Sequence, residues 1–315
     1  MPSEFGLIRQ YFTRPSPNGG VLLGVGDDAA LLMPPAGEVL AVTVDTLVAG
    51  RHFPETTLPA AIAHKALAVN LSDLAAMAAT PRWFLLALTL PEATDAFLTE
   101  FAAALFALAD AAGIALVGGD TTCGPLAISI TALGSVPPAL ALRRSGARPG
   151  DGIYVSGTVG DAGLGLREAL TPGEAGLSAE QAAYVRRRLD YPQPRLALGT
   201  ALRGTATACL DISDGLAQDL GHILTASGVG AALDLEALPL SSALRALPER
   251  EAWRLALTAG DDYELCFTLP DGLTPPVSPD GLAVTRIGTI TAAPGLVLRC
   301  RGERVDEELS GYRHF

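Results

Sequence analysis

Long hydrophobic runs, basic residues and aromatic residues are all scarce in this 315-residue sequence. No stretch of about 18 apolar residues is free of charges and helix breakers, so we expect no membrane span. Lys and Arg number 22 against 34 Asp and Glu, which gives a formal net charge of −12. Because nucleic acids and anionic membranes bind basic surfaces, we expect neither as a partner.

The four cysteines lie far apart, and no two of them form a C-x-x-C pair: Cys123, Cys209, Cys266 and Cys300. This spacing argues against a structural zinc site or a disulfide framework and favours reduced thiols. The first six residues, M-P-S-E-F-G, lack the basic and apolar segments of a secretory signal. We therefore expect a cytoplasmic protein.

The composition is otherwise that of a globular chain, with 49% hydrophobic and 18% charged residues. The length favours about two domains. Strand and helix patterns occur in both halves, which predicts an α/β or α+β fold. The stretch 137–152, with its Pro-containing turns and arginines, is the expected junction. We place an N-terminal domain at 1–138 and a C-terminal domain at 139–315.

The expected strands are 39–47, 83–90, 126–136, 153–156, 208–212, 231–235, 264–269, 283–290 and 296–301. The expected helices are 59–79, 94–113, 162–170, 184–189, a segment after Pro194, and 213–227. The first strand is unusual because Asp45 interrupts apolar residues and shares a face with Thr43. The opposite face, with Val42 and Val44, is expected to pack.

Five short acidic motifs recur along the chain. They are G-V-G-D-D-A-A (24–30), T-V-D-T (43–46), N-L-S-D (70–73), G-G-D-T-T (118–122) and D-I-S-D-G (211–215). Each alone is typical of a turn or a helix cap. Together they are less easily explained that way, because Asp73 lies on an apolar, Ala-rich helix. Asp120 follows an apolar run at an expected strand end, where α/β proteins build sites.

Oxygen ligands from several segments suit Mg²⁺, which usually shares its coordination shell with substrate phosphates. Zinc would favour Cys and His, and the four histidines show no H-x-x-x-H spacing. Bound divalent cations would also allow an acidic chain to bind a negatively charged phosphate, because they offset the repulsion between the two. The motifs therefore predict a Mg²⁺-dependent, ATP-using phosphotransferase.

Neither common nucleotide-binding pattern is present, since G-x-x-x-x-G-K-[ST] and the H-R-D and D-F-G set are both missing. The Gly-rich turn 156–165 could cradle phosphate or serve only for packing. The tripeptide Ser213-Asp214-Gly215 is the more specific signal, because a helix start there would join N–H donors to a metal-binding carboxylate.

The ordered set of motifs resembles the thiamine-monophosphate kinases, a family of the aminoimidazole-ribonucleotide-synthetase-like superfamily. The segments that carry the resemblance are 24–30, 45–53, 65–77, 118–122, 144–151, 211–223, 260–265 and the terminal G-Y-R-H-F. They span nearly the whole chain. The resemblance implies direct in-line transfer of the ATP γ-phosphate to thiamine monophosphate, the last step of thiamine diphosphate biosynthesis.

The resemblance also implies the residues of the site. The metal ligands would be Asp28, Thr43, Val44 through its carbonyl, Asp45, Asp73, Asp120, Asp211 and Asp214. Among these, Asp45, Asp120 and Asp214 would be central to catalysis. ATP would contact Gly119, Asp120, Arg144 and Ser213, and the thiamine substrate would contact His52, Asp261 and Tyr312. No protein nucleophile is implied, so catalysis would rest on alignment and charge neutralisation.

The fold implied by the resemblance has an N-terminal ATP- and Mg²⁺-binding domain and a C-terminal α/β domain that completes the site. The N-terminal sheets would join across a homodimer. Two residues depart from the family pattern: Asp261 stands where Glu is usual, and Ala78 where Gly is usual. The first change shortens a substrate contact by one methylene, and the second is expected to affect only helix packing.

Three alternative functions would require other residues. A selenophosphate synthetase would need a reactive Cys or its replacement near the N-terminus, and a hydrogenase-maturation relative would need a Cys at the extreme C-terminus. Segment 5–26 contains no Cys and the chain ends Y-R-H-F, which disfavours both. A non-enzymatic, acidic divalent-cation-binding protein is the third alternative, although no D-x-D-x-D-G loop occurs.

Overall fold

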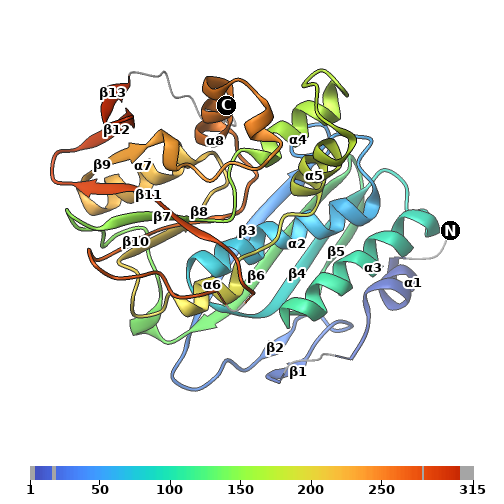
Figure 1. The fold of residues 1–315 in the computed structure, drawn as a ribbon. Helices are drawn as coiled ribbons and strands as arrows, with labels where there is room; N and C mark the ends of the chain where they lie inside the picture. The colour runs from blue at the N-terminus through green and yellow to red at the C-terminus, as the bar shows by residue number, and fades with distance from the viewer. Residues whose placement is uncertain (1–3, 16–18, 279, 306–315) are drawn as a thin grey trace. The chain divides into compact units, whose positions relative to one another are not determined.

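The computed structural model describes residues 4–15, 19–278 and 280–305, and the chain divides into two compact units (Figure 1). The first unit contains the residues up to Leu74 together with Ala79–Ala139. The second contains Ala75–Ala78 and the residues from Leu140 onward. Among the described residues, no helix combines the length and apolar character needed to cross a membrane.

A four-stranded sheet with the order β3-β6-β4-β5 forms the centre of the first unit. Its strands are β3 (Val39–Val48), β4 (Thr80–Leu90), β5 (Ala115–Cys123) and β6 (Ala127–Val136). Only the β4–β5 pair is parallel. Two long helices, α2 (Pro59–Ala76) and α3 (Asp95–Ala112), cover one face (Figure 1). The remaining elements are α1 (Glu4–Leu7), the π-helical turn η1 (Ile8–Phe12), and a small sheet of β1 (Val21–Leu23) and β2 (Leu31–Leu32).

Helix α3 shows how local sequence sets an element. Thr94 Oγ1 accepts a hydrogen bond from the Phe97 backbone N–H at 3.3 Å, as the expected N-cap does. Phe101 and Leu105 are buried at helical spacing. Gly113 ends the helix with a φ of +65°, a left-handed conformation that glycine adopts without strain.

Strand β3 corrects one expectation. Thr43 and Asp45 do share a face, and this face is half-buried. Its register pairs Asp45 with Ile130, whose side chain is buried, so it is the side on which the sheet packs. The opposite, apolar face is not packed: the side chains of Val42 and Val44 are 60% and 62% exposed.

A seven-stranded sheet with the order β13-β12-β9-β11-β7-β10-β8 forms the centre of the second unit. Its strands are β7 (Gly152–Ser156), β8 (Ala208–Asp211), β9 (Gly230–Asp234), β10 (Leu265–Leu269), β11 (Val284–Thr291), β12 (Gly295–Cys300) and β13 (Glu303–Val305). The helices are α4 (Asp161–Leu170), α5 (Ala179–Asp190), α6 (Leu196–Ala201), α7 (Leu216–Ser227) and α8 (Glu249–Thr258). Three short 3₁₀ helices are η2 (Pro138–Leu140), η3 (Leu235–Ala237) and η4 (Leu244–Ala246).

Apolar cores lie on both faces of this sheet. Helices α7 and α8 pack on one face, where Leu220 and Trp253 join the core with Ile153. Helix α6 packs on the other face, where Leu198 joins the core with Phe267. Helix α8 was not predicted, although acids in its first turn are a typical start signal. Mixed helix and sheet in both units confirm the expected α/β fold class.

Candidate active site

Two carboxylates and a hydroxyl meet in the first unit, between strand β3 and helix α2. The Thr43 hydroxyl donates a hydrogen bond to Asp73 Oδ2. Burial and, to a smaller extent, the charge of Asp73 together raise the pKa of Asp45 to about 6. Thr43, Asp45 and Asp73 therefore lie close to one another. The group offers only oxygen atoms, and a bound cation would relieve the repulsion between its two acids.

Strand β5 continues through the glycines and Asp120, so the expected strand end at this point is wrong. The pairing of β4 with β5 shifts register between Phe84 and Leu85, which marks a bulge. Gly119 has a φ of +151°, and a Cβ built there would lie 1.8 Å from the Leu86 carbonyl oxygen. No other residue fits at this position without moving the backbone.

A cavity of about 630 Å³ opens in the first unit beside this bulge. The acidic loop and strand β5 contribute its polar lining: Asp27, Asp28, Gly118, Gly119, Asp120 and Thr121. Asp28 and Asp120 are both exposed, and the Asp28 backbone N–H donates to Asp27 Oδ1 at 2.8 Å. Two of the predicted metal ligands and the predicted nucleotide contact Gly119 thus line one cavity.

The His52 ring has a defined orientation at the end of β3. Its Nδ1 accepts a hydrogen bond from the Val48 backbone N–H at 3.0 Å. A neutral imidazole with an acceptor at Nδ1 carries its proton on Nε2. The Lys65 ammonium in turn donates to the His52 carbonyl at 3.3 Å. The main chain around His52 and its ring are thus both held by hydrogen bonds.

Two loops pair in the second unit and bring four predicted site residues together. Backbone hydrogen bonds join Asp261 N to Ser213 O at 2.9 Å and Tyr263 N to Ile212 O at 2.8 Å. Asp211 pairs with Leu265 in the sheet. Both Asp261 and Tyr263 have positive φ angles, of +67° and +51°, which is uncommon outside glycine and typical of functional loops. The residues gathered are Asp211, Ser213, Asp214 and Asp261.

The N–H groups of Ser213, Asp214 and Gly215 are not free for a phosphate, contrary to the expectation from the sequence. All three donate to Asp219 Oδ2, at 3.0, 2.9 and 3.1 Å. The helix begins at Leu216, so the tripeptide precedes α7. Burial raises the pKa of Asp219 to about 6. This residue was missed, although an acid in the first turn after S-D-G is a capping signal.

The Gly-rich turn before α4 is a packing turn. Asp262 Oδ2 accepts from the Gly160 N–H at 2.5 Å, and Asp262 Oδ1 from the Ala162 N–H at 3.2 Å. Burial raises the pKa of Asp262 to about 8. A carboxyl group of the chain itself thus occupies the position where a phosphate would bind.

The remaining predicted residues are placed as follows. Val44 has an exposed side chain and Arg144 is exposed in the segment before β7. Tyr312 lies outside the described residues. Within the part of the chain that the structure describes, no group of three or more His, Cys, Asp or Glu residues is arranged to hold a metal ion. The acids instead gather separately in each unit.

Ala78 also differs from expectation. Its φ is +54°, so it occupies the left-handed position just after α2, where glycine is favoured. Its carbonyl accepts two hydrogen bonds from the Arg203 guanidinium, at 2.9 and 2.6 Å. The departure from glycine therefore affects the helix end, and not only side-chain packing.

Comparison with known proteins decides the family. Residues 26–136 match the AIR synthase related protein N-terminal domain, and residues 148–301 match its C-terminal domain. The thiamine-monophosphate kinase of Escherichia coli (strain K12) is 48% identical over 320 residues, covering 99% of this chain and 98% of that protein. The chain belongs to the thiamine-monophosphate kinase family. Both the sequence-based family assignment and the two-part fold are confirmed.

Two solved structures of this family are similar to the chain. The thiamine-monophosphate kinase of Stenotrophomonas maltophilia K279a is 47% identical, with a TM-score of 0.82 over 92% of this chain and 93% of that one. The structure described as AaThiL complexed with AMPPCP and TMP is 30% identical, with a TM-score of 0.78 over 90% and 89%.

Proposed function

We propose that this chain transfers the γ-phosphate of ATP to thiamine monophosphate, giving thiamine diphosphate and ADP. The observation that carries the proposal is 48% identity to a thiamine-monophosphate kinase over 99% of the chain. A complex of a 30% identical relative with AMPPCP and TMP supports the two substrates. The oxygen-only cluster of Thr43, Asp45 and Asp73 supports a phosphate-linked metal.

We propose Mg²⁺ as the metal. The donor chemistry fits, because Asp45 and Asp73 lie close enough for one charge to raise the pKa of the other group. In the first unit, Asp28, Thr43, the Val44 carbonyl, Asp45, Asp73 and Asp120 would hold metal ions. In the second unit, Asp211 and Asp214 would do so. Bound Mg²⁺ supplies neutralisation of the charge on the transferring phosphoryl group.

The chain's own residues are assigned positioning roles. Asp219 holds the main chain from Ser213 to Gly215 through three N–H groups. Because these N–H groups are occupied, the loop would bind ATP through the Ser213 hydroxyl and the Asp214 carboxylate. Gln218 Nε2 donates to Asp214 Oδ2 at 3.1 Å and fixes that carboxylate further. Gly119, Asp120 and Arg144 complete the proposed ATP contacts.

The acceptor site is proposed at His52, Asp261 and Tyr312. His52 offers an Nε2–H donor, held by the Val48 N–H on the other side of the ring. Tyr263 Oη donates to Asp261 Oδ1 at 3.0 Å and orients that shorter acid. Because the acceptor is itself an ionised phosphate, these residues need to align it and need not deprotonate it.

We also propose a homodimer and a cytoplasmic location. The exposed apolar face of the edge strand β3 supports a partner surface, because a lone edge strand with exposed valines favours association. The four cysteines form no disulfide, which is typical of a reducing compartment. The proposed domains, 1–138 for ATP, Mg²⁺ and dimer contacts and 139–315 for completing the site, follow the family assignment.

The test is a product assay with ATP, Mg²⁺ and thiamine monophosphate, compared with reactions that lack each component. We expect thiamine diphosphate and ADP in equal amounts. Asp45→Asn and Asp120→Asn are expected to lower kcat at least about a hundredfold while the fold is retained. Consumption of a different phosphate acceptor would overturn the substrate. Full activity in both variants would overturn the metal assignment.

A further inference from the structure

Three consecutive arginines, Arg186 to Arg188, stand out in an acidic chain and take no part in the proposed reaction. Arg186 Nη2 pairs with Asp190 Oδ2 at 3.1 Å on the same helix, α5. The Arg188 side chain is only 12% exposed and enters a buried polar network. Arg187 is exposed, and no described residue forms an ion pair or hydrogen bond with its guanidinium.

A cavity of about 440 Å³ lies beside α5, within the second unit. Its lining includes three arginines, two tyrosines and one side-chain amide: Arg187, Arg188, Arg195, Tyr184, Tyr191 and Gln193. Its size is within the range of small-molecule sites. None of the residues proposed to bind metal, ATP or the acceptor lines it.

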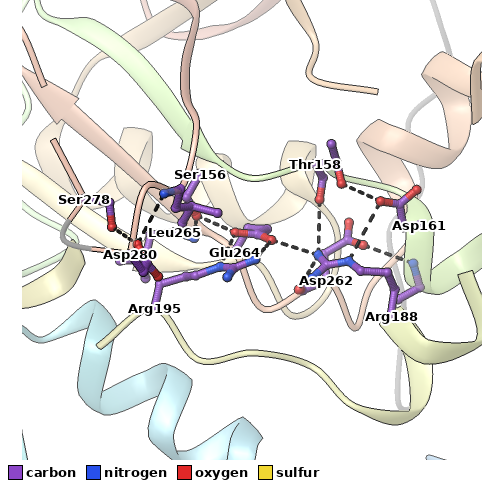
Figure 2. A network of polar contacts seen from close by, with 12 residues as sticks. Ser156, Thr158, Asp161, Arg188, Arg195, Asp262, Glu264, Leu265, Ser278 and Asp280 are labelled. Atoms are coloured by element: carbon purple, nitrogen blue, oxygen red, sulfur yellow. Dashed lines mark hydrogen bonds and ion pairs between the residues drawn. The ribbon is translucent and has the colours of Figure 1, made fainter. Parts of the chain in front are cut away.

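The base of the cavity is a buried carboxylate, Glu264, bound by two guanidinium groups (Figure 2). Arg195 binds it in a fork, with Nε 2.7 Å from Oε2 and Nη2 bonded to Oε1. Arg188 Nη2 lies 2.8 Å from Oε1. Ser156 Oγ donates to Oε2 at 2.5 Å. The fork uses one edge of Arg195 and leaves its Nη1 outside the pairing.

Arg188 carries an unused donor at this place. Its Nε is buried and has no hydrogen-bond partner among the described residues. The nearest acid, Asp161, has Oδ2 3.8 Å from Nε, beyond hydrogen-bonding distance. Asp161 is already bonded by the hydroxyl groups of Thr158, Tyr184 and Ser241. A buried guanidinium N–H without an acceptor is costly, so Arg188 retains hydrogen-bonding capacity that the chain's own residues do not use.

Acids lie beside two of the three arginines. Glu264, Asp262 and Asp161 interact with Arg188, and Asp280 lies near Arg195 (Figure 2). Arg187 is the arginine that none of these acids contacts among the described residues, so its guanidinium group provides the positive charge that would attract an anion.

We propose that this cavity is an additional anion site that binds a phosphate group through Arg187, Arg188 and Arg195. Guanidinium groups match the geometry and charge of phosphate oxygens. Tyr184 and Tyr191 line the same cavity and offer ring surface to whatever the phosphate is attached to. The site is independent of the proposed catalytic function.

The test is calorimetric titration of the full chain with inorganic phosphate and with phenyl phosphate, at constant ionic strength. A non-hydrolysable ATP analogue with Mg²⁺ is present throughout, so that the nucleotide site is filled. Arg187→Ala removes an exposed side chain with no described partner and is expected to weaken binding about tenfold or more. Arg186→Ala is the matched control, since Arg186 is the next residue on the helix and does not line the cavity.

Unchanged binding in Arg186→Ala together with the loss in Arg187→Ala supports the site. Tighter binding of phenyl phosphate identifies an organic phosphate as the ligand class, and tighter binding of inorganic phosphate identifies the free ion. The proposal is overturned if neither probe binds saturably in the presence of the ATP analogue, or if the two variants lose affinity equally.

Discussion

Two buried carboxyl groups, Asp219 and Asp262, account for much of the local order at the ends of α7 and α4. Each accepts main-chain N–H groups that would otherwise be unsatisfied at a helix start. Each also has a raised pKa because burial penalises its charged form. Neither residue touches a substrate in the proposed mechanism. Their effect on activity is exerted through the loops that they hold.

Replacement of Asp219 by Ala is expected to disorder the Ser213–Gly215 segment, because three N–H groups lose their shared acceptor. We expect KM for ATP to rise at least about tenfold, and stability to fall by about 2–4 kcal/mol. Steady-state kinetics at a temperature where the variant is folded would separate the two effects. His222→Ala is the control, since His222 is exposed on the same helix, α7, and has no role in the proposed site. An unchanged KM in a folded Asp219→Ala enzyme would contradict the positioning role.

The raised pKa of Asp262 predicts that the free energy of unfolding depends on pH. Its folded-state pKa, about 8, is above the unfolded value, so the folded state holds the proton more tightly. The stabilisation is complete below about pH 4 and is lost as the pH rises through 8. Between pH 6.5 and 9 the free energy of unfolding is expected to fall by about 2 kcal/mol from this group.

Urea unfolding of the wild type and of Asp262→Asn at these two pH values would measure the effect. The variant is expected to lose stability at pH 6.5, where it lacks the neutral carboxyl, and to show a smaller fall with pH. Parallel curves for the two proteins would contradict the assignment.

At the scale of elements, the strand β3 matters most. One face carries Thr43 and Asp45 toward the packed side of the sheet, and the other exposes valines. A strand at the edge of a sheet also has unpaired main-chain groups. The same element therefore holds a predicted metal site and a surface that favours association.

Val42→Arg places a charge in the middle of this apolar face and is expected to shift the protein from dimer to monomer. Light scattering on a sizing column, over a range of concentrations, would measure the change. Val277→Arg is the control, because Val277 is 89% exposed and lies in the second unit. A dimer that persists in Val42→Arg would place the association surface elsewhere.

Secondary structure was largely predictable where one period dominates, and the reasons for the failures are physical. Helix α3 was found because its cap, stripe and terminal glycine agree. Strand β5 was ended too early, because nothing local to Gly118–Asp120 reveals that β4 continues to pair with it. The exposed face of β3 was expected to pack within the chain. The sequence of an apolar face does not show whether residues of the same chain or of a second chain pack against it.

The sequence predicted which types of residue gather in the candidate site. It predicted fewer of the contacts between them. The pairing of Thr43 with Asp73 follows from residues that the strand and helix periods had already singled out. The hydrogen bonds from the S-D-G backbone to Asp219 were not predicted. The sequence of a Gly-containing loop before a helix does not show whether the N–H groups of that loop are free or already bonded.

At the scale of the whole molecule, the net charge of −12 and the clustered acids predict stabilisation by divalent cations. Mg²⁺ is expected to raise Tm by about 3 °C or more, whereas NaCl at equal ionic strength is not. The physical reason is relief of repulsion between Asp45 and Asp73. Calorimetry with and without EDTA would measure it.

Asp73→Asn is the decisive variant for this effect, since it removes one of the two repelling charges. Its Tm is expected to respond less to Mg²⁺ than that of the wild type. Asp110→Asn is a suitable control, because Asp110 pairs with Arg14 at the surface, away from β3. Equal Mg²⁺ responses in all three proteins would contradict the account.

The backbone at Gly119, which follows the bulge in strand β5, restricts which residue can stand there. Even a methyl group there would overlap the Leu86 carbonyl, whatever ligand the neighbouring cavity holds. The backbone alone therefore requires glycine here. A glycine at the same place in another chain with this strand pairing would carry no information about the reaction that the other chain performs.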